Sequence, residues 1–126
     1  MKEKDVEIFK KIQAQLQSVY QEISALSKKT PNDGVNKFKL KFINQILVNL
    51  NSFLDKKYSP FSDFTVFSED DLPTNADVVF ILSQYLSCME KMRADNIDQD
   101  MGSWYWSING KITNIRTARP QKLERN

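Results

Sequence analysis

The fold class of this chain is indicated most clearly by residues 74–94, TNADVVFILSQYLSCMEKMRA. Apolar side chains recur there at spacings of four, three, four and three, which is the period of one helix face: Val78, Leu82, Tyr85, Met89 and Met92. Thr74 can cap the start of such a helix by accepting a hydrogen bond from a first-turn N–H group, and Asp77 follows three residues later. The pattern predicts a helix over residues 74–94.

An earlier helix is predicted over residues 4–28, before a chain break at residues 30–34, TPNDG. Six apolar residues follow one another at spacings of three, four, three, four and three: Phe9, Ile12, Leu16, Val19, Ile23 and Leu26. This N-terminal seam has two apolar positions in every seven, which is narrower than the stripe of a helix enclosed by its own domain. We therefore expect the seam either to pack inside a helical bundle or to contact another protein chain.

A third helix is predicted over residues 35–57, which carry a broad apolar stripe at helical spacing. The stripe consists of Val35, Phe38, Phe42, Ile43, Ile46, Leu47, Leu50, Phe53 and Leu54. Asn32 or Asp33 would cap its start. Residues 37–42, KFKLKF, also alternate between basic and apolar side chains, as a half-buried strand would. Because the helical pattern is much longer than the alternating one, we expect a helix.

Two strand-prone runs lie near the C-terminal end, WYWSI at residues 104–108 and KITNI at residues 111–115. They are separated by Asn109-Gly110, a dipeptide that fits a two-residue hairpin turn. Such a turn predicts three cross-strand pairs: Ile108–Lys111, Trp106–Thr113 and Trp104–Ile115. Since an isolated hairpin is only marginally stable in water, its tryptophan face must lie on the helices or on a partner.

The remaining segments are interpreted as connections. Residues 58–72 are acidic and rich in phenylalanine, and they fit either a short helical turn that begins at Ser59-Pro60 or a short strand at residues 64–67. Residues 95–103 are expected to form a polar loop.

The predicted fold is therefore mainly α with a small β element. It is a three-helix antiparallel bundle followed by a C-terminal β-hairpin, with an α+β fold as the alternative. We expect residues 1–117 to form a single domain and residues 118–126 to form a basic, flexible tail.

Composition argues against an enzyme. The 126 residues include no histidine, which is the commonest general base and a common metal ligand. Cys88 is the single cysteine, so a zinc site of the Cys/His type is excluded and a small buried hydrophobic role is expected. The acidic residues Glu69, Asp70, Asp71 and Asp77 fit helix-dipole and solvent-exposed roles better than a magnesium site. We expect no metal and no cofactor.

The sequence has a net charge of +2, and its two ends are basic while its middle is acidic. In the simpler interpretation, the opposite charges of these segments compensate each other at the protein surface. In the more specific interpretation, a basic face steers an acidic partner toward it. The sequence contains no apolar run long enough to span a bilayer and no signal-peptide pattern, so we expect a cytoplasmic protein without membrane contact.

Two functional hypotheses follow from these patterns. The first is a non-enzymatic interaction module, an accessory or regulatory subunit that binds a protein partner or itself through the N-terminal seam and the aromatic hairpin. The alternative is a single-stranded nucleic-acid-binding module that uses Trp104, Trp106, Arg116 and Arg119, since exposed aromatic side chains beside cations stack and hold bases. A tryptophan face that covers the helical core is the structural explanation of the same residues.

Overall fold

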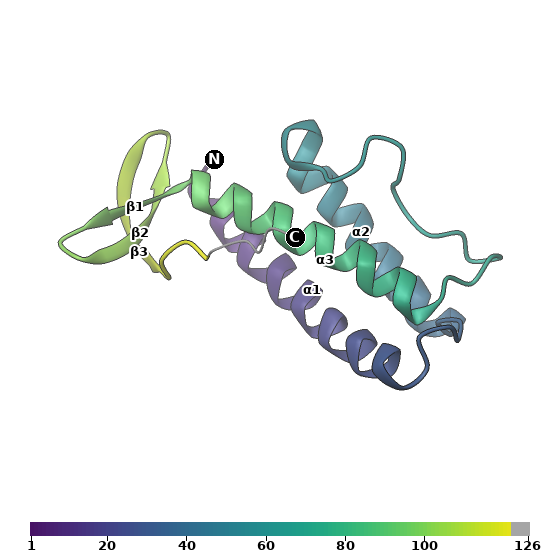
Figure 1. The fold of residues 1–126 in the computed structure, drawn as a ribbon. Coiled ribbons are helices and arrows are strands. Elements are labelled where there is room, and N and C mark those ends of the chain that lie inside the picture. The colour runs from purple at the N-terminus through teal and green to yellow at the C-terminus, as the bar shows by residue number, and fades with distance from the viewer. Residues whose placement is uncertain (122–126) are drawn as a thin grey trace.

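The computed structural model describes residues 1–121 as three long helices followed by a three-stranded antiparallel sheet (Figure 1). The helices are α1 (Glu3–Lys29), α2 (Lys37–Tyr58) and α3 (Asn75–Asp95), and the strands are β1 (Ile97–Asp100), β2 (Ser103–Ile108) and β3 (Lys111–Thr117). The predicted fold class, mainly α with a small β element, is confirmed. Residues 37–42 belong to α2, so the strand alternative for them is wrong.

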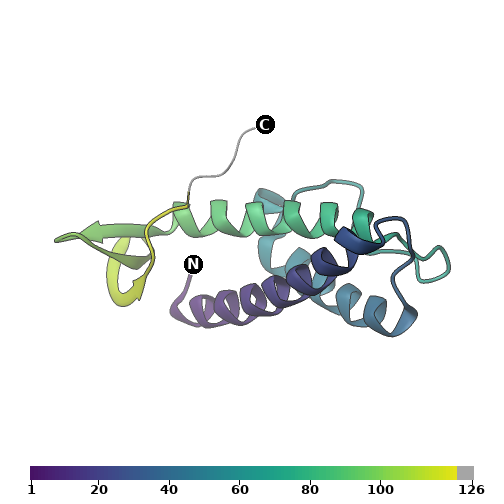
Figure 2. The same cartoon turned by 60° about the horizontal axis from the view of Figure 1, so that its bottom comes forward.

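Helix α1 runs antiparallel to both other helices, so α2 and α3 run in the same direction (Figures 1 and 2). The end of α1 and the starts of α2 and α3 meet at one end of the bundle. There the Asn75 side chain donates to the Thr30 carbonyl at 2.9 Å. The backbone N–H of Val35 also donates to the Pro73 carbonyl at 2.9 Å. The chain between α2 and α3 must consequently return along the length of the bundle.

This return is made by the connector, residues 59–74, which forms neither the helical turn nor the strand predicted for it. Two asparagines of α2 hold its backbone instead. The Asn44 amide donates to the Phe67 carbonyl at 2.9 Å and accepts from the Phe67 N–H at 3.0 Å. The Asn51 amide donates to the Thr65 carbonyl at 2.8 Å. Because side-chain amides satisfy these backbone groups, the connector can lie on α2 without a strand partner.

The helix starts differ in one detail from the prediction. Thr74 caps α3 as predicted, since its hydroxyl accepts from the Asp77 N–H at 3.1 Å. Helix α2 is capped by Asn36, whose side chain accepts from the Lys39 N–H at 2.8 Å, so the prediction of Asn32 or Asp33 is wrong. The reason is that the Val35 N–H is hydrogen-bonded to the connector and Asn36 has an extended backbone, so the helix begins only at Lys37.

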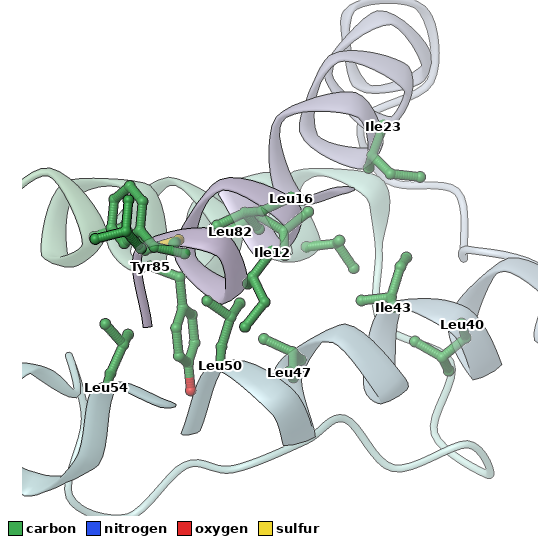
Figure 3. Close-up of a cluster of buried hydrophobic side chains, with 14 of the residues drawn as sticks. Ile12, Leu16, Ile23, Leu40, Ile43, Leu47, Leu50, Leu54, Leu82 and Tyr85 are labelled. Atoms are coloured by element: carbon green, nitrogen blue, oxygen red, sulfur yellow. The ribbon is translucent and has the colours of Figure 1, made fainter. Parts of the chain in front are cut away.

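The hydrophobic core lies between the three helices (Figure 3). Helix α2 contributes five fully buried side chains at spacings of three and four: Leu40, Ile43, Leu47, Leu50 and Leu54. Tyr85 of α3 reaches toward α2, where its hydroxyl donates to the Asn51 side chain. Asn51 therefore links α3, α2 and the connector.

The sheet contains one strand that the sequence did not predict. Strand β1 occupies part of the expected polar loop and pairs with β2 through a tight turn at Met101-Gly102. Both turn residues have positive φ, 50° and 84°, as do Asn109 and Gly110 in the predicted turn, 52° and 78°. Methionine rarely adopts this conformation, so the sequence carries no recognisable turn signal at residue 101.

The pairing of β2 with β3 follows the prediction only at the turn. Ile108 pairs with Lys111, but Tyr105 pairs with Arg116 and Trp104 with Thr117. The predicted pairs Trp106–Thr113 and Trp104–Ile115 are wrong because β3 has two extra residues opposite Trp106, where the Thr113 hydroxyl donates to the Trp106 carbonyl at 2.7 Å. A shift of two residues leaves each side chain on its predicted face.

The segment that follows β3 is held by a buried ion pair on α3. The Arg93 guanidinium donates to both carboxylate oxygens of Glu90, at 2.8 and 3.0 Å, and both side chains are buried. Its other N–H groups donate to the Thr117 hydroxyl and to the carbonyls of Ala118 and Arg119, at 2.9, 2.7 and 2.9 Å. Residues 118, 119 and 121 of the predicted tail are thus hydrogen-bonded to α3, and residues 122–126 of that prediction lie outside the described residues.

Candidate protein-interaction surface

The structure places the N-terminal seam in the core of this chain. Phe9, Ile12, Leu16 and Ile23 are buried, and Figure 3 shows the last three among the core side chains. The other two seam residues, Val19 and Leu26, are half-buried and pack against the same core. Of the two expectations for the seam, packing inside the helical bundle is the one observed. The seam is therefore not a free surface for a partner.

The tryptophans and arginines proposed for nucleic-acid binding are not brought together. Trp106 is only 1% exposed, and its ring centroid lies 5.1 Å from that of Phe9 in an edge-to-face contact. Trp104 is half-buried against the core. Arg116 pairs with Tyr105 and therefore lies on the opposite face of the sheet, where it donates to the Ser103 hydroxyl at 2.9 Å.

Arg119 lies beyond the sheet, and its backbone carbonyl accepts from the buried guanidinium of α3. The face of the sheet that carries Arg116 also carries Asp98, which pairs with Tyr105 on the other side. This face thus presents an acid and a base on either side of a tyrosine. The tryptophan face covers the helical core, which is the structural explanation given above for these residues.

Two aromatic side chains of α2 are exposed next to each other. Phe38 is 73% exposed and Phe42 is 45% exposed, and their ring centroids lie 5.1 Å apart at an interplanar angle of 71°. Both residues were predicted to belong to the core stripe, and this prediction is wrong. Residues 38 and 42 share one side of a helix, whereas Leu40 points to the opposite side and is fully buried. Since the core takes Leu40, the two phenylalanines must face outward.

The same hexapeptide contained the signal for this exposure. In KFKLKF, a helix can bury either Phe38 and Phe42 or Leu40, but not both. The leucines and isoleucine that follow at spacings of three and four continue the Leu40 face. A stripe drawn through Leu40 instead of the phenylalanines would have identified the pair as exposed.

An open groove lies between α1 and α2, about two helical turns beyond Phe42. It is lined by Ile8, Lys11, Ile12, Gln15, Asn49, Ser52 and Phe53. On α2, Phe42, Ile46, Asn49 and Phe53 follow one another at spacings of four, three and four, so they share one side of the helix. We define the α1–α2 surface by five apolar residues that are exposed or half-buried: Ile8, Phe38, Phe42, Ile46 and Phe53.

Lysines surround the phenylalanine end of this surface. Lys37, Lys39 and Lys41 alternate with the apolar residues at the start of α2. Lys39 approaches Glu22 of α1 at 3.7 Å. The first turn of α2 contains no acidic residue, whereas Glu3 occupies the first turn of α1. Cations at the start of a helix oppose the positive end of its dipole, so this arrangement is locally unfavourable.

The remaining candidate groups are the single cysteine and the acidic side chains. Cys88 is half-buried, and burial raises the pKa of its thiol, which disfavours the reactive thiolate. Within residues 1–121, no three histidine, cysteine, aspartate or glutamate side chains are grouped closely enough to hold a metal ion. None of the described helices is both long and apolar enough to cross a membrane.

Comparisons with protein-family models, with curated proteins and with solved structures find no significant match to this chain.

Proposed function

We propose that this chain is a non-enzymatic protein-interaction module, an accessory or regulatory subunit whose contact surface is the α1–α2 surface. The observation that carries the proposal is the exposed pair Phe38–Phe42, together with the open groove between α1 and α2 that Ile8 and Phe53 line further along the same helix face. This proposal moves the contact away from the N-terminal seam, most of which is buried, and away from the tryptophan face, which packs on α1.

The free energy of burying the two phenylalanines favours a partner that covers this surface. Full burial of one phenylalanine side chain is worth about 1.5–3 kcal/mol relative to exposure. Two adjacent phenylalanines left in water therefore represent a substantial free energy that a partner can gain. Aromatic anchors of this kind dominate the binding energy of many interfaces. Single exposed apolar residues are ordinary, but an aromatic pair on the same helix face as a groove is typical of a contact site.

The groove also has the shape required for one common recognition mode. Two antiparallel helices, α1 and α2, form its walls, and apolar side chains at helical spacing lie along it. An amphipathic helix or an extended segment can lay its apolar face into such a groove. A second copy of the chain is the other possible occupant, because the same surface would then be covered on both copies.

The proposal is tested with the variant Phe38→Ser/Phe42→Ser and a matched control, Phe80→Ser. Phe80 is 56% exposed on α3 and lies outside the α1–α2 surface, so the control also removes an exposed phenylalanine. Affinity purification from the native cell should recover the same partners with the wild type and the control, and lose them with the double variant. Light scattering over a range of concentrations reports self-association of the same three proteins.

Circular dichroism first establishes that the double variant remains folded, which we expect because both side chains lie outside the core. Equal recovery of partners and equal mass for all three proteins would contradict the proposal. Loss of partners with Phe80→Ser alone would place the contact on α3 instead.

A further inference from the structure

Resting on the proposed function and deepening it, we infer that the partner of the α1–α2 surface is an acidic amphipathic segment of another protein. Its apolar side chains would cover Phe38 and Phe42 and continue toward the groove. Its carboxylates would face Lys37 and Lys41 at the start of α2. Three features of α2 support this partner: an exposed aromatic pair, a cluster of lysines around it, and a helix start that lacks acidic residues.

The first turns of the three helices differ in charge. Helix α1 has Glu3 and Asp5 in its first turn and α3 has Asp77, each placed where the helix dipole favours an anion. Helix α2 has Lys37 and Lys39 there and no acidic residue. The unfavourable placement is therefore specific to the helix that carries the exposed phenylalanines. A partner carboxylate at this position would interact favourably with the lysines and with the dipole together.

The neighbouring acids of this chain do not neutralise the cluster. Glu22 lies 3.7 Å from Lys39, and both side chains are substantially exposed, so the pair is weak. Glu69 of the connector shares a shallow depression with Lys41, but no ion pair joins the two residues in the structure. Lys37 and Lys41 both remain exposed and available to a partner.

The geometry favours a protein segment over a single-stranded nucleic acid. Bases stack on flat aromatic faces, but the rings of Phe38 and Phe42 meet at 71°, edge to face, and present no common plane. Beyond Phe42, the surface continues with Ile46 and, on α1, with Ile8, and aliphatic side chains offer no stacking platform. Aliphatic and aromatic anchors of an amphipathic segment fit both parts of the surface.

The test uses peptide display on the intact chain. A random library of peptides of about 20 residues, long enough for an amphipathic helix, is selected on the wild type. The enriched peptides are then measured against Phe38→Ser/Phe42→Ser by fluorescence anisotropy. We expect peptides rich in aspartate and glutamate, with apolar residues at helical spacing, whose affinity falls about tenfold or more in the phenylalanine variant.

A charge variant separates the acidic character of the partner from its apolar contact. In Lys37→Glu/Lys41→Glu, the selected acidic peptides should bind about tenfold more weakly, and the remaining affinity should lose most of its dependence on salt. The melting temperature should not fall, because glutamate at residue 37 suits the helix dipole. The matched control Lys10→Glu/Lys111→Glu makes the same change in net charge at two exposed positions away from the surface and should bind as the wild type does.

The outcomes distinguish this inference from the proposed function. Peptides that lose binding in the phenylalanine variant but carry no excess of acidic residues overturn the inference and leave the proposed function standing. Selected peptides that bind the phenylalanine variant as well as the wild type overturn both. Binding of a 20-nucleotide oligo(dT) that is lost in either variant would assign the surface to nucleic acid and overturn the inference. Self-association that is lost in the charge variant would make a second copy the occupant, and would likewise overturn it.

Discussion

Asp55 interrupts α2 with a φ of 56° and a ψ of −169°, a backbone conformation that is essentially restricted to glycine. The Ser59 hydroxyl and backbone N–H both donate to the Asp55 carbonyl, at 2.6 and 3.0 Å, and hold the kink in place. The kink turns the chain out of the helix just before the connector begins. The strained backbone of Asp55 therefore contributes to ending α2 at this point.

Replacement of Asp55 by glycine should stabilise the protein by about 1 kcal/mol. Strain in this region costs about 1–3 kcal/mol, and the greater freedom of glycine in the unfolded chain offsets up to about 1 kcal/mol of the relief. The free energy of unfolding from urea titration measures the change. Asp55→Ala, which removes the carboxylate but keeps the Cβ atom, serves as the control and should show no comparable gain. A loss of stability in the glycine variant would show that the carboxylate matters more than the strain.

At the scale of the elements, the end of α2 is joined to the end of α3 through one carboxylate. Asp95 accepts from the Lys91 ammonium at 3.0 Å and from the Tyr58 hydroxyl at 2.8 Å. These hydrogen bonds lower the pKa of Asp95 below its usual value, and the hydrogen bond to Asp95 raises the pKa of Lys91. Both groups are therefore charged across the neutral range.

The contribution of Asp95 to stability should depend on pH in a defined direction. Because its pKa is lower in the folded state, the stabilisation is fully present above the unfolded value, about 3.9. It is lost as the pH falls through the folded pKa. We expect Asp95→Asn to be slightly less stable than the wild type at pH 7 and equally stable at the acidic end of the range. Urea titrations of both proteins at several pH values measure this, and a difference that grows toward acid would contradict it.

The elements themselves could be predicted from the sequence to different extents. The three helices lie within two residues of their predicted bounds, because their apolar spacing and their polar breaks are local signals. Strand β1 could not be predicted, since IDQD has a single apolar residue and becomes a strand only by pairing with β2. The register of β3 was missed because a bulge depends on tertiary contacts rather than on turn residues.

At the scale of the whole molecule, the candidate site was the least predictable part. A helix can carry apolar residues on two faces. Which of these faces packs in the core depends on where the neighbouring helices lie. Leu40 and Phe38 compete for the core in the same hexapeptide; the spacing of the later apolar residues of α2 favours Leu40, and the assembled bundle confirms it. The N-terminal seam was ambiguous for the same reason, because its spacing fits a partner in the same chain and one in another chain equally well.

The buried pair of Glu90 and Arg93 ties the end of β3 and the segment after it to α3, in addition to the packing of Trp106 on Phe9. All five N–H groups of Arg93 have acceptors, and one Glu90 oxygen also accepts from the Gln121 N–H at 3.0 Å. Removing one member of a buried, bidentate ion pair strongly destabilises a protein, because the remaining charge is buried without its partner. Truncation after Thr117 keeps the pair and removes only two backbone acceptors and one backbone donor.

We therefore expect Arg93→Ala to lower the free energy of unfolding by about 3–5 kcal/mol, and truncation after Thr117 to lower it by about 1–3 kcal/mol. Both changes release residues 118–121, so the difference between them isolates the cost of an unpaired Glu90 charge. Addition of Glu90→Gln to the Arg93→Ala variant removes that charge and should recover part of the loss. Urea unfolding of the four proteins gives the comparison. A truncation as costly as Arg93→Ala, with no recovery in the double variant, would show that the C-terminal segment itself, rather than the ion pair, holds the sheet to the bundle.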